Sequence, residues 1–181
     1  VAEYMLVHRS EAIMQNDAER ISTAGKQRIL SSTINILSRE IAANGKSPTL
    51  CDSLNSQSIQ LNSINYQLSV RYEDDFASAG IEAALLDNRE KINTRLRSLN
   101  RNLQPIKKYC STGSGAQQAQ AAALRIDKGT PGLLHLLNQN AANYEKLAKN
   151  RIWRVQRYKY YALAGSIIIY IAFGFLFAFP V

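Results

Sequence analysis

The chain has 181 residues, with 22 Lys or Arg against 14 Asp or Glu, and a formal net charge of +8 at pH 7. Its length and its 46% hydrophobic content exclude a disordered chain and a miniprotein that depends on disulfides. Only 9 Gly and 4 Pro are present, which disfavours the frequent turns of a β-sandwich, so we predict an all-α fold. A net positive charge suggests nucleic acid or an anionic membrane as a partner. Which of the two applies depends on where the basic residues lie in the chain.

Helical periodicity predicts four helices, over residues 2–43, 53–77, 88–109 and 130–159. Asn44-Gly45 is expected to end the first helix, and Thr130-Pro131 to open the fourth as an N-cap and a first-turn proline. The Ala/Gln tract at 116–124 has helix propensity but little to bury. The expected core residues are Leu30, Ile34, Leu37 and Ile41; Leu54, Leu61, Ile64, Leu68 and Tyr72; Ile92, Leu96, Leu99, Leu103 and Ile106; and Ala141, Tyr144, Ala148, Ile152 and Val155.

Residues 160–181 contain no charged residue and no histidine. About 20 apolar residues are enough to cross a bilayer, and core helices of this length seldom lack a polar face, so we predict a transmembrane helix there. We expect the fourth helix to continue into it as one rod, leaving residues 1–159 as a domain outside the membrane. Val1 is not an initiator Met and Glu3 excludes a signal peptide, so we expect the chain to begin within a longer protein.

Four amphipathic helices with short connections predict an antiparallel up-down-up-down bundle. In that topology the first and third connections lie at the same, membrane-distal end, and Cys51 and Cys110 flank these connections. Their shared location favours a disulfide over two separate buried thiols, and hence an oxidising compartment such as the periplasm.

The basic residues before the apolar run favour a cytoplasmic location over a periplasmic one, because the positive-inside tendency would place them in the cytoplasm. Taken alone, this flank predicts a cytosolic bundle with a C-terminal tail anchor. The six residues are Lys146, Lys149, Arg151, Arg154, Arg157 and Lys159.

The first helix also carries small and basic residues on the side opposite its predicted core stripe. Such a helix needs a second partner, and in a symmetric dimer that partner is the same helix of another copy. Two Arg28 side chains meeting there would repel unless an anion lay between them, and guanidinium groups suit a planar oxyanion. A solvated Arg28 beside an incidental small patch is the other interpretation. The predicted ligand-binding residues are Ile21, Ala24, Gly25, Arg28, Ser32 and Arg39.

Residues 17–31 read Asp-Ala-Glu-Arg-Ile-Ser-Thr-Ala-Gly-Lys-Gln-Arg-Ile-Leu-Ser. This segment resembles the P-box of bacterial nitrate/nitrite sensor kinases and of the type IV pilus chemotaxis transducer N-terminal domain, which read approximately Asp-Ala-x-x-Ile-Asn-x-Ala-Gly-x-x-Arg-Met-x-Ser. The aromatic end at 175–180 is similar to the exit of the second transmembrane helix of such receptors, and members often carry basic residues before that helix. The rest of the chain resembles these families in layout only.

The resemblance implies a dimeric periplasmic four-helix sensor that binds a small ligand between its two first helices and transmits a helix displacement across the membrane. It gives Arg28 the role of gripping the anion and Gly25 that of allowing close approach. Two departures, Ser22 for the family Asn and Thr33 for a second basic residue, imply weaker nitrate binding or another ligand, with Arg39 better placed than Lys26 to compensate.

No catalytic motif, metal site or cofactor is predicted. His8 and His135 lie in different predicted helices without partnering Cys or carboxylate motifs, and residues 73–75 form an acidic patch without further oxygen ligands. A nucleic-acid partner is disfavoured, because the basic residues are not interleaved with stacking aromatics.

The sequence thus predicts the sensing module of an inner-membrane receptor, a homodimer with a small anionic ligand, whose kinase, diguanylate cyclase or chemotaxis output lies beyond residue 181. The alternative is a tail-anchored cytosolic adaptor or tether. The identity of the ligand and the type of output stay open.

Overall fold

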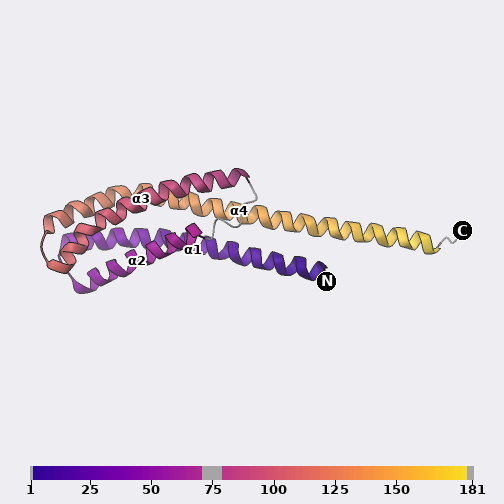
Figure 1. Ribbon diagram of the computed structural model, residues 1–181, viewed down its shortest axis with the longest axis horizontal. Coiled ribbons are helices and arrows are strands. Elements are labelled where there is room, and N and C mark those ends of the chain that lie inside the picture. The colour runs from indigo at the N-terminus through magenta and orange to yellow at the C-terminus, as the bar shows by residue number, and fades with distance from the viewer. Residues whose placement is uncertain (1, 71–78, 179–181) are drawn as a thin grey trace. The chain divides into compact units, whose positions relative to one another are not determined.

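The computed structural model describes the backbone of residues 2–70 and 79–178, and the side chains of residues 14–69 and 83–175. These residues form four helices and no strand, so the predicted all-α class is confirmed for them. The helices are α1 (Ala2–Asn44), α2 (Pro48–Val70), α3 (Ala79–Thr112) and α4 (Ala116–Ala178) (Figure 1). The chain divides into two units, one of Glu19–Tyr144 and one of Val1–Ala18 with Glu145–Val181, and we describe each by itself.

Glycines in the left-handed region separate the helices where the chain turns sharply. The Gly45 N–H donates to the Ile41 carbonyl at 3.1 Å with φ at 85°, which ends α1 where the sequence predicted. Gly113, at φ 74°, ends α3 in the same manner through the Tyr109 carbonyl. Pro48 is the first residue of α2, a position where its missing N–H costs no helical hydrogen bond.

Three of the four predicted helices have boundaries that differ from the structure. Helix α2 begins at Pro48 rather than near residue 53, and its predicted end near 77 lies outside the described residues. Helix α3 extends beyond 88–109 at both ends. Helix α4 begins at Ala116, well before the predicted start at Thr130, because the break is supplied by Gly113 and Gly115.

Thr130 and Pro131 therefore lie inside α4 and do not open a helix. The Thr130 hydroxyl donates to the Ile126 carbonyl at 2.7 Å, a back-bond within the helix. Pro131 has no N–H for the carbonyl four residues earlier, so this is a weak point of an otherwise regular helix. A Thr-Pro pair can open a helix or lie inside one. The sequence alone therefore placed the start of α4 at the wrong residue.

The core of Glu19–Tyr144 contains most of the residues that helical spacing selected there. Of the five expected in the fourth helix, Tyr144 and Ala148 are buried and Ala141 and Val155 are half-buried. The expectation for Ile152 is wrong, because it is 38% exposed where most of α4 is no longer covered. All five predicted positions of α3 are buried, as are most of those of α1 and α2, while Leu37 and Ile64 are half-buried and Tyr72 lies outside the described residues. The expectation that the Ala/Gln tract buries little is wrong. Ala119, Ala122 and Ala123 are at most 3% exposed, because alanine lets α4 approach its neighbours closely.

Polar contacts show the relative direction of neighbouring helices within this unit. Between α1 and α4, hydrogen bonds join Arg28 to Asn138, Asn35 to Asp127, and the Ala42 carbonyl to Gln120. Between α2 and α3, they join Asn65 to Asn93, Asn62 to Asn100, and Ser58 to Lys107. Residue numbers rise along one helix as they fall along the other, so both pairs run antiparallel.

The other unit combines the start of α1 with the second half of α4. Asp17 of α1 is 7% exposed at its side chain and forms an ion pair with Arg151 of α4 at 2.9 Å. Beyond Arg151, the side chains of α4 are mostly exposed up to Phe175, including its isoleucines and aromatics. Among the described helices, α4 alone is long and apolar enough to cross a membrane by length and composition.

Candidate ligand and dimer surface of helix α1

The predicted ligand-binding residues of α1 do not all lie on an open surface. Arg28 and Arg39 are exposed, and Ile21, Gly25 and Ser32 are half-buried. Ala24 is only 1% exposed and packs inside its own chain, so it is unavailable to a second copy as the sequence interpretation required. The predicted ligand-binding face of α1 is therefore rotated about the helix axis from the face of α1 that the chain leaves uncovered.

The cause of this rotation is a set of buried polar residues on α1. Gln27, Ser31 and Ser38 are each at most 1% exposed and extend the packed side toward Ala24. The predicted core side of α1 was defined by apolar residues alone and therefore omits these three polar residues. The opposite side, at about 100° per residue, is centred on Ile29 and Ile36, which are 60% and 53% exposed.

The uncovered side of α1 has a heptad spacing, and we call it the α1 face. Its positions follow steps of three and four residues, with isoleucine at two of them and small residues at three. A Cβ added to Gly25 would meet no atom within 4 Å, so contacts within the chain do not require glycine there. The α1 face consists of Ser22, Gly25, Ile29, Ser32, Ile36 and Arg39.

Arg28 lies at the edge of the α1 face and has a neutral partner. Its Nη1 donates to the Asn138 Oδ1 of α4 at 3.1 Å, and both side chains are exposed. Among the described side chains, no carboxylate oxygen is within ion-pair distance of the Arg28 guanidinium. The positive charge at this edge is therefore uncompensated, and the remaining N–H groups can bind an anion.

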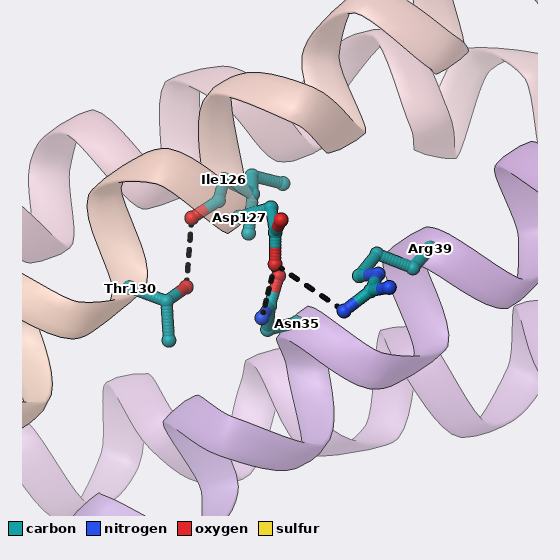
Figure 2. Close-up of polar contacts among 5 residues, drawn as sticks. All are labelled: Asn35, Arg39, Ile126, Asp127 and Thr130. Atoms are coloured by element: carbon teal, nitrogen blue, oxygen red, sulfur yellow. Dashed lines mark hydrogen bonds and ion pairs between the residues drawn. The ribbon is translucent and has the colours of Figure 1, made fainter.

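Arg39 differs from Arg28 because α4 supplies it with a counter-charge. Figure 2 shows the Arg39 guanidinium directed at Asp127, with 3.6 Å between Nη1 and Oδ1. The same oxygen accepts a hydrogen bond from Asn35 Nδ2 at 3.0 Å, so Asp127 bridges two turns of α1. This carboxylate reduces the capacity of Arg39 to bind a further anion. The sequence analysis missed Asp127 because it lies before the predicted start of the fourth helix, and missed Asn138 because nothing local to it indicates a contact with Arg28.

A disulfide joins Cys51 near the start of α2 to Cys110 near the end of α3, with the two Cα atoms 5.7 Å apart. This is the pair that the sequence analysis favoured. A Cβ added to Gly45 would lie 3.7 Å from the Tyr109 hydroxyl oxygen, so the turn after α1 also approaches the end of α3. The turns at 45–47 and 113–115 therefore lie at the same end of this unit.

An amide ladder at the interior of the same unit was not predicted. Gln27 Nε2 donates to Asn65 Oδ1 at 3.1 Å, and Asn65 Nδ2 donates to Asn93 Oδ1 at 2.9 Å. The Gln27 Oε1 is buried and has no hydrogen-bond partner in the part of the chain that the structure describes. A small cavity beside it has a volume of about 20 Å³ and is lined by Asn140 and Tyr144 among others, which is room for one water. Polar residues recurring at core spacing are the signal that could have revealed this ladder.

The unit that contains Arg151 has a larger cavity, of about 160 Å³. Met14, Ile152 and Val155 supply an apolar wall, and the Asp17–Arg151 ion pair with Lys159 supplies a charged one. The ion pair gives Asp17, the first residue of the P-box-like segment, a structural role.

Metal-ligating groups do not cluster in the described part of the molecule. Over side chains 14–69 and 83–175, no three His, Cys, Asp or Glu residues are grouped as metal ligands. His135 contacts Gln139 one turn along α4, with 3.0 Å between the His135 Nε2 and the amide nitrogen. The side chains of His8, Glu73, Asp74 and Asp75 lie outside the described residues.

Comparisons of the chain with protein-family models, with curated proteins and with solved structures gave no match.

Proposed function

We propose that this chain is the extracytoplasmic ligand-sensing module of a bacterial transmembrane signalling receptor. In this proposal, Glu19–Tyr144 is an up-down-up-down four-helix bundle, and α4 continues from it into the inner membrane. Two copies pair through their α1 faces and hold a small anion, nitrate or a related ligand, between two Arg28 side chains. The antiparallel contacts between α1 and α4 and between α2 and α3 support the bundle.

The observation that carries the proposal is the uncompensated charge of Arg28 beside an uncovered helix face. Among the described side chains, Arg28 is bonded to the neutral Asn138, whereas Arg39 is paired with Asp127. Ile29 and Ile36 leave apolar surface exposed next to it, and Gly25 and Ser32 leave room for a second helix. Two Arg28 side chains brought together across such a contact would repel, and a bound oxyanion relieves that repulsion.

The proposed output follows from helix packing. An anion that draws two α1 helices together changes their separation, and packed helices respond by shifts of about 1–2 Å. Because α4 contacts α1 through Asn35, Asp127 and Arg28, such a shift is passed to α4 and from there to the membrane. The catalytic or chemotaxis step belongs to an output domain after the span, so we assign no catalytic residue to this module.

The test is a thermal titration of the full chain in nanodiscs with sodium nitrate, followed by circular dichroism at 222 nm. A ligand that binds only the folded state raises the unfolding midpoint as its concentration exceeds Kd. We expect nitrate to raise the midpoint of the wild-type chain and of Arg97→Gln, an exposed arginine of α3. Arg28→Gln should lose the shift entirely. An undiminished shift in Arg28→Gln would overturn the site.

The basic residues at 146–159 favour a second function, a tail-anchored cytosolic tether. The two proposals differ in the redox state of Cys51 and Cys110, because cytosolic thiols are kept reduced. Alkylation of cells with a maleimide before lysis distinguishes them. Protected cysteines support the sensor, and full labelling of both supports the tether.

A further inference from the structure

Helix α4 has an exposed stripe of cationic and aromatic side chains just before its apolar run. These residues follow steps of three, four, four and three, so they lie on one side of the helix at about 100° per residue. All five are exposed. We call this stripe the collar, and it consists of Lys146, Lys149, Trp153, Arg157 and Tyr160.

The collar lies on the side of α4 that is not packed. Leu147 and Ala148 are buried, and Arg151 is held by Asp17, all on the other side of the helix. Trp153 is 60% exposed and Tyr160 is 72% exposed, although removing large aromatic side chains from water is favourable. Contacts within the described chain therefore do not account for these aromatics.

The cations of the collar are also uncompensated. Glu145 is the only acidic residue between 145 and 159, where six residues are basic. Among the described side chains, Lys146, Lys149 and Arg157 have no carboxylate partner. The Arg157 guanidinium stacks over the Trp153 ring, with 4.6 Å from Cζ to the ring centroid. This stacking fixes a cation and an aromatic ring in one place on the helix.

The position of the collar indicates which partner it meets. The uncharged run begins at Tyr160, so at about 1.5 Å per residue the collar extends about 21 Å along the helix from that point, with Trp153 and Arg157 within about 10 Å of it. Trp and Tyr are enriched at the level of lipid headgroups, and basic residues near a bilayer are attracted to anionic lipids. A zwitterionic headgroup presents its own ammonium beside the phosphate, whereas an anionic phosphodiester lipid presents a net negative charge.

We propose that the collar binds the phosphate groups of anionic phospholipids, such as phosphatidylglycerol, around α4. This proposal depends on the membrane span proposed above but is independent of the ligand at Arg28. Lys146, Lys149 and Arg157 supply the positive charge, while Trp153 and Tyr160 set the depth of the helix. The collar thereby accounts for part of the basic flank without placing it in the cytoplasm.

Trp153 is the only tryptophan of the chain, so its fluorescence reports directly on the collar. The full chain is reconstituted in lipid vesicles that contain equal fractions of phosphatidylcholine and phosphatidylglycerol, with bromine on the acyl chains of one or the other. Bromine quenches a nearby indole ring. We expect brominated phosphatidylglycerol to quench Trp153 at least about threefold more effectively, given the attraction of several basic residues.

Three variants define which residues are responsible. K146Q/K149Q/R157Q should reduce the quenching ratio to about 1, and the charge-retaining K146R/K149R/R157K should keep it. R97Q/R101Q/K108Q removes the same charge from exposed positions of α3 and should also keep it. Preference retained in the first variant would overturn the collar as the lipid site.

Two further outcomes distinguish a failure of the lipid site from a failure of the proposed membrane span. Equal quenching of the wild-type chain by both brominated lipids would overturn the proposal and would leave the collar to another partner, such as an acidic protein. Absence of quenching by either lipid would mean that Trp153 does not lie at a bilayer. That result would overturn the proposed span and, with it, the lipid site.

Discussion

Helix α4 runs through two regions that differ in the exposure of their apolar side chains. Within Glu19–Tyr144, Ile126, Leu133 and Leu137 are at most 3% exposed, whereas Ile168 and Phe175 further along the same helix are each 66% exposed. In the first region, the buried apolar residues lie on one side of the helix, and the other side is mostly polar, with Leu124 as an exposed exception. In the second, apolar residues surround the helix. One helix can thus be amphipathic over one stretch and apolar on all sides over another, and the second pattern is the one expected of the proposed membrane span.

The largest expected effect concerns the unit Glu19–Tyr144 and its disulfide. C51S/C110S removes a bridge that closes a loop of 59 residues, so we expect a loss of about 4 kcal/mol in the free energy of unfolding of Glu19–Tyr144. Urea unfolding of the full chain in detergent micelles, followed at 222 nm, measures this loss. Dithiothreitol should lower the stability of the wild-type chain by a similar amount and leave the variant unchanged. A variant as stable as the oxidised chain would show that the bridge adds nothing.

A matched pair of isoleucine truncations tests the contrast between the two regions. Ile34 is 0% exposed, so Ile34→Ala should cost about 2–5 kcal/mol through lost burial and the cavity left behind. Ile168→Ala should leave the same urea midpoint within about 0.5 kcal/mol, because Ile168 makes no core contact. Equal losses would mean that the apolar run packs on protein and does not face lipid.

The smallest effect concerns the α1 face. Gly25→Ala should stabilise the isolated protomer by up to about 1 kcal/mol, because alanine favours a helix interior and the added Cβ meets no atom. The same methyl group would obstruct a second α1, so sedimentation equilibrium in micelles should show weaker dimerisation than in the wild type. A variant that is destabilised as a protomer would indicate that Gly25 already packs against its own chain.

The all-α class, the core stripe of α3 and the cysteine pair were predictable because each depends on local periodicity or on simple topology. The start of α4 was not, because Thr130-Pro131 fits a helix start as well as an interior position, and only the positive φ of Gly113 and Gly115 decides. The orientation of α1 was predicted only in part. Buried Gln27 and Ser31 lie on the packed side. Ser31 donates to the Gln27 carbonyl within α1, whereas Asn65, the partner of the Gln27 side chain, is distant in sequence.

Pairing of two α1 helices beside Arg28 is the central claim, and cysteine cross-linking in native membranes tests it most directly. Ser32→Cys places a thiol on the α1 face, and Gln60→Cys places one on an exposed position of α2. With mild oxidation, we predict a covalent dimer on non-reducing gels for Ser32→Cys and none for Gln60→Cys. A dimer formed equally by both variants, or by Gln60→Cys alone, would contradict the account.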